Sequence, residues 1–280
     1  MVRASRAANK GWVLTPVAAD DRAASANRTR FGSLMAVAIE AAEGRCEPAI
    51  RRSRHATTYH LQLDGGGRKV DFFVKVYRRP KGLEPLRRLL RRSRIDHAIK
   101  IGTELRNHGF CVAPILIRGA NLGDGRSMLV TARAEGVPLA DVVATLAVDR
   151  KRRWLERLGE EVARLHRAGF IHGDLTPYNI FITQEPARFT FIDNDRTRRT
   201  RPIRAGRQRL RNFVQLGRFD LAGVTRADRI RVLRAYASAL GLRNWHSLRN
   251  RAAAMLGARM DRDRLKPDSH PNAQPALPNR

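Results

Sequence analysis

The chain has 280 residues, 42% of them hydrophobic and 29% charged, which is enough for one large or two modest domains with a buried core. Its 55 Lys and Arg against 26 Asp and Glu give a net charge of +29, which favours a polyanionic partner without identifying it. No stretch of about 20 apolar residues predicts a membrane-spanning helix, and no secretory signal is visible. The two distant cysteines, Cys46 and Cys111, indicate reduced thiols, and Cys111 is expected in the core.

The first third of the chain predicts a basic lead, one helix and a β-hairpin. Residues 1–30 are expected to be a disordered basic lead, and residues 31–42 a helix. Alternating apolar residues predict strands at Tyr59–Asp64 and Val70–Tyr77, joined by a glycine-rich turn. A strand follows this turn where a phosphate-binding loop would need a helix N-terminus, so we interpret the glycines as hairpin residues.

The next segments continue the strand-rich half. Residues 78–100 are strongly basic with interspersed leucines, a pattern typical either of a solvated surface helix or of a surface for anionic lipid. Helix is expected at His97–His108, stopped by Gly109, and strands at 111–118 and 127–132. Together these elements predict an N-terminal lobe, residues 31–132, built as a small antiparallel sheet with one helix.

The second half of the chain predicts mostly helix. The expected helices span residues 139–146, 151–168, 208–216, 226–240 and 245–260, and residues 261–280 are expected to be a disordered tail. Residues 133–260 would then form a mostly helical C-terminal lobe. The predicted fold class is therefore α+β, with two lobes and a site between them.

The stretch from Ile171 to Arg196 carries the chemistry. It reads I-H-G-D-L-T-P-Y-N-I-F-I and, after a short connection, F-T-F-I-D-N-D-R. The spacing H-x-D-x-x-x-x-N followed by an apolar pair and Asp is the catalytic-loop and metal-loop pattern of phosphoryl transfer from ATP. Asp174 is the candidate general base, and Asn179 and Asp193 offer the oxygen ligands that Mg²⁺ prefers. His172 is expected to orient the loop without doing chemistry.

Three further residues, Lys75, Glu104 and Asp195, are candidates. Lys75 lies inside the apolar strand F-F-V-K-V-Y, where burying an unpaired ammonium group would be costly. Binding of ATP phosphates, with Glu104 as the ion-pair partner of Lys75, would offset this cost. The alternative is a lysine that simply faces outward. Asp195 either joins the metal ligands or pairs with Arg196.

At these residues the chain resembles the lipopolysaccharide core kinases, the Kdo and heptose kinase family within the protein-kinase-like fold. The resemblance covers about residues 50–236 and is strongest in F-I-D-N-D-R, because most protein kinases read D-F-G there. It implies ATP and Mg²⁺ as cofactors, the site roles given above, and a hinge near Ala132–Glu135. The chain departs from the general kinase pattern in lacking G-x-G-x-x-G, with Arg52–Thr58 in its place.

Three hypotheses follow. The first is a kinase that phosphorylates Kdo or heptose in the lipopolysaccharide core, at the cytoplasmic face of the inner membrane, with its basic surface on the anionic leaflet. The second, favoured by T-P-Y-N and disfavoured by Asp195, is a RIO- or Bud32-type atypical protein kinase or ATPase that acts near RNA. The third is a non-catalytic basic scaffold, which the complete set of catalytic positions disfavours. Nucleic acid is a disfavoured partner that the charge does not exclude.

Overall fold

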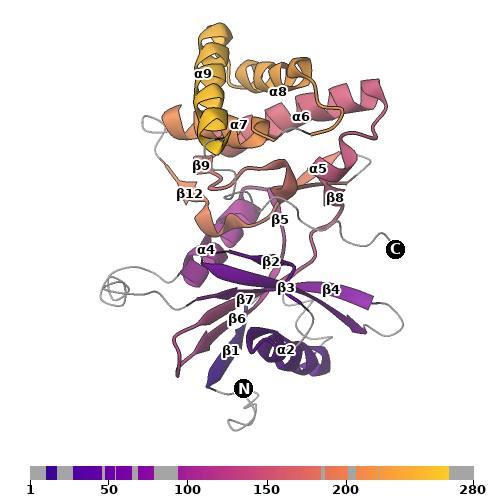
Figure 1. Cartoon of the computed structure of the whole chain (residues 1–280), viewed down its shortest axis with the longest axis vertical. Helices are drawn as coiled ribbons and strands as arrows, with labels where there is room; N and C mark the ends of the chain where they lie inside the picture. Colours follow the sequence, from indigo (N-terminus) through magenta and orange to yellow (C-terminus); the bar gives the residue numbers. More distant parts are fainter. Residues whose placement is uncertain are drawn as a thin grey trace. The chain divides into compact units, whose positions relative to one another are not determined.

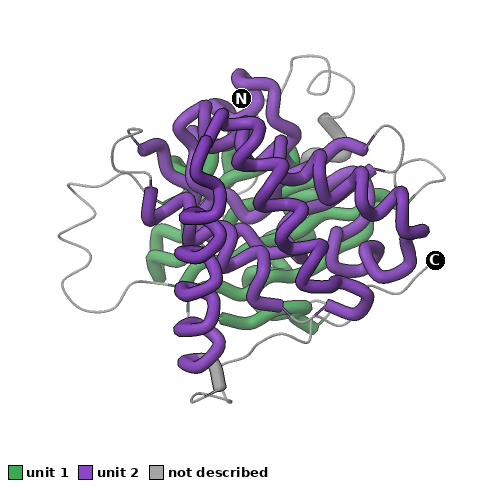
Figure 2. Tube along the Cα trace, turned by 90° about the horizontal axis from the view of Figure 1, so that it is seen from above, with its two compact units in different colours: residues 1–99, 113–133, 271–280 green, residues 100–112, 134–270 purple. Residues whose placement is uncertain are grey.

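Residues 11–17, 28–45, 48–53, 55–64, 69–78, 94–183, 187–200, 206–219 and 221–264 are those that the structure, a computed structural model, describes. They divide into two units (Figure 2). Unit 1 holds the described residues up to Ile99 together with Ala113–Arg133, and unit 2 holds Lys100–Val112 and the described residues from Ala134 onward. The predicted α+β class is confirmed.

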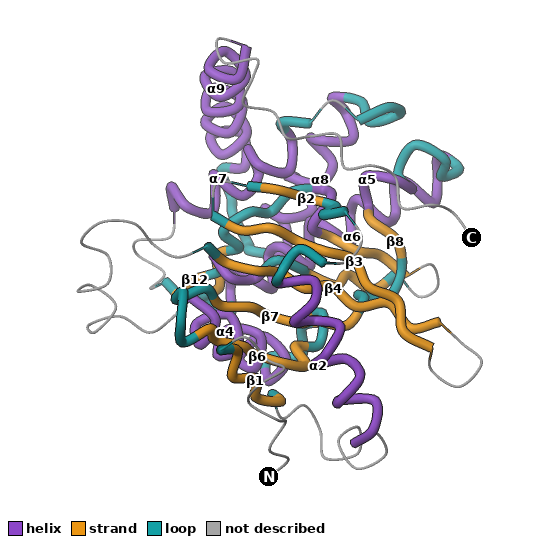
Figure 3. Tube along the Cα trace, turned by 60° about the horizontal axis from the view of Figure 1, so that its bottom comes forward, coloured by secondary structure: helices purple, strands orange, loops and turns teal. Residues whose placement is uncertain are grey.

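Unit 1 is built on a six-stranded antiparallel sheet with the order β1-β6-β7-β4-β3-β2 (Figure 3). The predicted hairpin is confirmed as β3 paired with β4, and its turn lies outside the described residues. The strands are β1 (Trp12–Pro16), β2 (Arg51–Arg52), β3 (Ala56–Asp64), β4 (Lys69–Tyr77), β6 (Ile115–Asn121) and β7 (Ser127–Ala132).

The two faces of this sheet pack against different helices. Val74 and Val76 of β4 belong to the apolar cluster that includes α2 (Arg28–Ala42), while Tyr77 belongs to a second cluster that includes the first half of α4 (Arg94–Asn107). Because successive strand residues point to opposite faces, Lys75 lies on the α4 face. Both predicted helices are confirmed, and Gly109, with φ of 75°, lies just after α4.

The prediction of a disordered lead is wrong for Trp12–Pro16, which forms the edge strand β1. Trp12 is buried, its Nε1 donates to Oε1 of Glu43 at 2.9 Å, and the guanidinium of Arg126 lies 5.6 Å from its ring centroid. The strand pairs antiparallel with β6 along its whole length. The basic composition of residues 1–30 gave no indication of this strand, because the strand forms by pairing with the distant β6.

The single strand predicted at residues 111–118 is also wrong, because the chain divides there into β5 (Cys111–Val112) and β6. Pro114 lies between the two and has no N–H with which to continue a ladder. Strand β5 pairs in parallel with β11 (Arg188–Phe191) in unit 2, with Val112 buried and Cys111 exposed. Cys111 is therefore a surface residue and not a core residue. Cys46 and the basic residues 79–93 lie outside the described residues.

Unit 2 combines two small sheets with the second half of α4 and five further helices in its described part. One sheet has the order β5-β11-β10-β8, and the other pairs β9 with β12. The new elements are β8 (Val137–Pro138), β9 (Phe170–Ile171), β10 (Ile180–Thr183), β12 (Arg198–Arg199), α5 (Leu139–Val142), α6 (Val148–Arg167), α7 (Gly206–Gly217), α8 (Arg226–Ala239) and α9 (Trp245–Arg264). All five predicted helices are confirmed, α5 in a shorter form, and α9 extends beyond its predicted end at residue 260.

The core of unit 2 forms where α6 packs along α8, side by side in Figure 1. The apolar stripe of α6, which includes Leu158, Val162 and Leu165, is fully buried. Gly159 allows the close approach, since a Cβ there would overlap the carbonyl oxygen of Val232. In the part of the chain that the structure describes, no helix is both long and apolar enough to cross a bilayer.

Candidate active site

Two short strand pairings bring two loops of unit 2 together. We call residues His172–Asn179 the catalytic loop and residues Asp193–Arg196 the metal loop, after the sequence pattern that each carries. Strand β9 before the first loop pairs with β12 after the second, and the N–H of Thr200 donates to the carbonyl of Gly169 at 2.8 Å. Between them, β10 and β11 form an antiparallel hairpin with Ile180 opposite Phe191. The N–H of Ile192 continues this hairpin by donating to the carbonyl of Asn179 at 3.0 Å. Asn179 and Asp193 are therefore placed at the same end of one hairpin.

His172 joins the two loops through both ring nitrogens. It is 1% exposed; its Nδ1 accepts from the N–H of Asp174 at 3.1 Å, and its Nε2 donates to the carbonyl of Ile192 at 3.0 Å. This pattern requires the neutral imidazole. Burial lowers the pKa of His172, against the opposing influence of the Ile192 carbonyl and of the charges on Asp193, Asp174 and Asp195. The hydrogen bonds match the orienting role predicted for this histidine.

Three carboxylates therefore lie near one buried neutral ring: those of Asp174, Asp193 and Asp195. Like charges gathered in a partly buried place favour a cation among them. Among the described residues, no group of three His, Cys, Asp or Glu side chains is arranged to hold a metal ion by itself. The predicted ligand pair of one carboxamide and one carboxylate would leave the remaining positions on a cation to phosphate and water.

Asn179 is 3% exposed, and its orientation is fixed by the catalytic loop. Its Nδ2 donates to the carbonyl of Asp174 at 2.8 Å, and its backbone N–H donates to the carbonyl of Thr176 at 3.0 Å. The short helix Pro177–Asn179 supplies this turn. With the amide nitrogen engaged on the loop, the carbonyl oxygen Oδ1 is the atom that suits a hard cation.

Asp193 has an unusual backbone conformation. Its φ of 59° and ψ of 47° place it in the left-handed region, and no other non-glycine residue in the described ranges has a positive φ. Such a conformation costs on the order of 1 kcal/mol for an L residue and is frequent at functional sites. The turn is held by Asn194, whose Nδ2 donates to the carbonyl of Phe191 at 2.8 Å and whose Oδ1 accepts from Thr197 at 3.1 Å. Asp195, two residues on, is buried.

Helix α7 holds the catalytic loop through side-chain hydrogen bonds, and these contacts were not predicted from the sequence. Nδ2 of Asn212 donates to the carbonyl of His172 at 2.6 Å, and Nε2 of Gln215 donates to the carbonyl of Gly173 at 3.0 Å. Oε1 of Gln215 also accepts from the N–H of Leu175 at 3.4 Å. Asn212 is 1% exposed among the apolar residues of α7. A polar residue on the apolar face of a predicted helix is the signal that could have revealed it.

The support extends further into the core through His166. Its Nε2 donates to Oδ1 of Asn212 at 3.0 Å, and its Nδ1 lies 3.0 Å from the hydroxyl of Tyr236 in α8. Burial lowers the pKa of His166 to about 4 and raises the pKa of Tyr236 to about 12, so both are neutral near pH 7. A chain of neutral hydrogen bonds thus links α8, α6 and α7 to the catalytic loop.

Glu104 lies on α4 within unit 2, where two cations approach its carboxylate. Nζ of Lys100 is 3.6 Å from Oε1, and Nη1 of Arg199 is 3.9 Å from Oε2. Within the described residues, the buried Oε2 accepts no hydrogen bond. Lys75 belongs to unit 1, where its Nζ lies 5.5 Å from the ring centroid of Tyr77 and its strand partners are Thr58 and Leu129. The Lys75–Glu104 ion pair stays a prediction.

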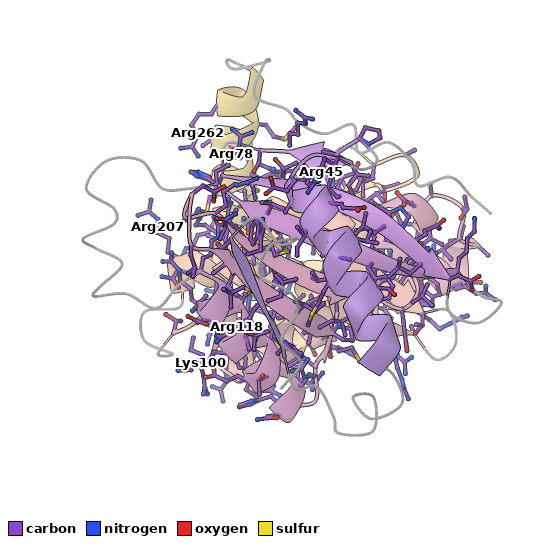
Figure 4. The ribbon with its side chains drawn as sticks, turned by 90° about the horizontal axis from the view of Figure 1, so that it is seen from below. Arg45, Arg78, Lys100, Arg118, Arg207 and Arg262 are labelled. Carbon is purple, nitrogen blue, oxygen red and sulfur yellow. The ribbon has the colours of Figure 1, made fainter. Side chains whose placement is uncertain are left out.

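Exposed cationic side chains occur on both units. Figure 4 labels Arg45, Arg78 and Arg118 of unit 1 and Lys100, Arg207 and Arg262 of unit 2, all of which are exposed. Directly after the metal loop, Arg196, Arg198 and Arg199 are exposed as well. Cations at these positions suit an anionic substrate that reaches the loop.

The comparison with protein families agrees with this geometry. The model of the lipopolysaccharide kinase (Kdo/WaaP) family matches residues 74–236, more than half of the chain, and this range includes every residue predicted to take part in catalysis or in nucleotide and metal binding. No curated protein gives a significant match. The family implies the use of ATP, typically with Mg²⁺, and action on lipopolysaccharide. The chain therefore belongs to the lipopolysaccharide kinase (Kdo/WaaP) family and is a kinase of lipopolysaccharide biosynthesis.

Proposed function

We propose that this chain transfers the γ-phosphoryl group of ATP to a hydroxyl of Kdo or heptose in the lipopolysaccharide inner core. The observation that carries the proposal is the hydrogen-bonded convergence of Asp174 and Asn179 with the Asp193 turn around neutral His172. Family membership supports the glycolipid acceptor over the protein acceptor of a RIO- or Bud32-type kinase.

In the proposed reaction, Asp174 is the general base. It accepts the proton of the sugar hydroxyl as that oxygen bonds to the γ-phosphorus, and the bond from phosphorus to the bridging oxygen breaks to release ADP. Asn179 and Asp193 would hold Mg²⁺, which when bound neutralises charge on the phosphates. The fixed carboxamide of Asn179 and the strained Asp193 backbone are what a preorganised ligand pair requires.

The upstream residues complete the proposed enzyme. Lys75 would contact the α- and β-phosphates, with Glu104 as its ion-pair partner. Its position on the α4 face of the sheet supports this role over that of a purely solvent-facing lysine. The corresponding architecture is the two-lobed protein-kinase-like fold, with a hinge at Ala132–Glu135.

The acceptor would be met at the cytoplasmic face of the inner membrane. Exposed arginines, including Arg196, Arg198 and Arg199, support contact with phosphates of the glycolipid and with anionic lipid headgroups. Such contacts weaken as salt screens the charges, over a Debye length of about 10 Å at 0.1 M. Peripheral attachment of this kind requires no spanning helix.

An acceptor assay tests the proposal directly. Purified protein is incubated with ATP, Mg²⁺ and either Kdo-lipid A or a heptosylated core, and the products are read by mass spectrometry. One added phosphate on a sugar of either acceptor supports the proposal. Phosphate on protein substrates, with both glycolipids unmodified, would overturn it in favour of the RIO- or Bud32-type alternative.

Asp174→Asn supplies the mechanistic control. Turnover should fall by about 10²–10⁴-fold, the usual contribution of a general base, while Mg·ATP still binds. The same exchange at Asp149, whose side chain is 81% exposed on α6, should leave turnover unchanged. Equal loss in both variants, or in neither, would remove Asp174 from its proposed role.

A further inference from the structure

Tyr178 carries a partly exposed aromatic ring in the catalytic loop. Every other residue from Leu175 to Ile180 is buried, so Tyr178 is the position at which this part of the loop reaches the surface. Among the described residues, its ring belongs to none of the three apolar clusters. An aromatic ring that a loop holds near the surface, without burying it in a core, is available to a ligand.

The loop turns tightly between Asp174 and Tyr178. The N–H of Thr176 donates to the carbonyl of Asp174 at 2.9 Å, and the N–H of Asn179 donates to the carbonyl of Thr176 at 3.0 Å. The side chain of Asn179 closes the turn on the same carbonyl of Asp174. This turn is shorter than the roughly 14 Å of four extended residues. A ligand at the Asp174 carboxylate therefore has Tyr178 as a neighbour on the same loop.

Phe219, two residues after the end of α7, holds the Tyr178 ring. The two ring centroids are 5.4 Å apart with an interplanar angle of 83°, which is an edge-to-face arrangement. The guanidinium of Arg218 lies 4.8 Å from the ring centroid of Phe219, and Nη2 of Arg229 in α8 donates to the carbonyl of Phe219 at 3.1 Å. The ring of Tyr178 is thus held before any ligand arrives, which lowers the entropy cost of binding.

A sugar ring matches this surface. A pyranose has a face of C–H groups that packs against an aromatic ring, whereas its hydroxyls project from the ring edge. Packing of the sugar face on Tyr178 would leave the edge hydroxyls available to Asp174. The hydroxyl of a serine or threonine acceptor belongs to no ring, so such an acceptor would gain little from Tyr178.

We infer that Tyr178 binds the acceptor by packing against the C–H face of the sugar ring that is phosphorylated, and that Phe219 is the residue that positions the Tyr178 ring. The inference rests on the proposed function, because it takes Asp174 as the base and a sugar hydroxyl as the acceptor. The contact uses the ring of Tyr178 and not its hydroxyl. It concerns the acceptor alone, so ATP binding should not depend on it.

Steady-state kinetics, with ATP and the acceptor varied separately, isolates this contact. The acceptor is whichever of Kdo-lipid A and the heptosylated core the unmodified chain phosphorylates. Tyr178→Ala should raise KM for the acceptor by about 10-fold, as expected for loss of an aromatic contact, and leave KM for ATP unchanged. Tyr178→Phe keeps the ring and should keep both KM values. Phe219→Leu should raise KM for the acceptor in the same selective way but to a smaller extent.

Trp245→Ala is the matched control, because Trp245 is also a half-buried aromatic residue of unit 2 with an arginine, Arg249, beside its ring. It should leave both KM values unchanged. An unchanged KM for the acceptor in Tyr178→Ala would overturn the inference while the proposed function stands. A rise in both KM values would also overturn it, since that would point to a damaged loop.

Two further outcomes are decisive. An equal rise of the acceptor KM in Tyr178→Phe and Tyr178→Ala would overturn the inference, because the hydroxyl and not the ring would then make the contact. An unmodified chain that phosphorylates neither glycolipid would overturn the proposed function itself, and the inference with it.

Discussion

Gly173 lies so close to Arg196 that a Cβ on Gly173 would overlap both the Cβ and the carbonyl group of Arg196. This contact packs the catalytic loop against the end of the metal loop. Gly173→Ala should therefore force the two loops apart, at a cost of about 1–3 kcal/mol in the free energy of unfolding, and reduce ATP turnover. Urea unfolding and a steady-state assay measure the two effects.

Gly257→Ala is the control for this substitution, because a Cβ at Gly257 would meet nothing within 4 Å on helix α9. It should leave turnover unchanged and raise stability by up to about 1 kcal/mol through helix propensity. If Gly173→Ala behaves like Gly257→Ala, the contact with Arg196 has no part in holding the loops.

Asp193→Gly should separate stability from activity. Glycine adopts the left-handed backbone of this position without steric cost, so the substitution should raise stability by about 1 kcal/mol. Losing the carboxylate should at the same time abolish phosphate transfer. Thermal unfolding and product analysis on one preparation provide both numbers. A variant that is less stable than the parent would contradict the assignment of strain to this residue.

Asn212→Ala should lower kcat although it removes no group that is proposed to contact a substrate. It removes the hydrogen bond to the carbonyl of His172 and the acceptor of the hydrogen bond from Nε2 of His166. Leaving such buried polar groups unpaired should lower the free energy of unfolding by about 1–3 kcal/mol. We expect kcat to fall while KM for ATP changes little, because the loop moves and the contact proposed between Lys75 and the phosphates is unaffected. Asn250→Ala, an exposed position on α9, is the matched control. A fall in stability with kcat unchanged would limit Asn212 to a structural role.

Stability should decline as the pH falls below about 6.5, in part because of His166. Its pKa is about 4 in the folded chain and near 6.5 when unfolded, so the unfolded state binds the extra proton between these values. The contribution is complete above pH 6.5, and about 3 kcal/mol of it is lost by pH 4. His166→Gln should flatten the pH dependence of the unfolding free energy over this range, and the same exchange at exposed His246 should not. Parallel pH curves for the parent and His166→Gln would refute the assignment.

The grouping of the candidate site residues could be predicted from the sequence because it depends on local spacing. Asn179 and Asp193 flank short strands, and the observed hairpin brings them to one end as such a pattern suggests. Asp174 is joined to them by the hydrogen bond from the Asn179 side chain to its carbonyl. Helices with a clear apolar period, such as α6, were also predictable. The orienting role of His172 needed only the loop in which it lies.

Features that depend on distant pairing could not be predicted in the same way. Trp12–Pro16 becomes a strand only because β6 offers it an edge, and Cys111 is exposed because Pro114 divides one apolar stretch between two sheets. The hydrogen bond from Asn212 to the catalytic loop could not be predicted without knowing that α7 packs against this loop. Local composition does not indicate which distant segments will pair, so these contacts are seen only in the folded chain.

The ladder between β9 and β12 closes the chain from Phe170 to Arg199 into a loop whose two ends hold each other. Backbone amides inside such a closure exchange their hydrogens with solvent through shared opening events, and residues on both loops then report one opening free energy. Asp174 and Asp193 would accordingly gain or lose order together. Asp174 and Asp193 are in this sense parts of one cooperative segment, and breaking the pairing of β9 with β12 should disorganise both loops.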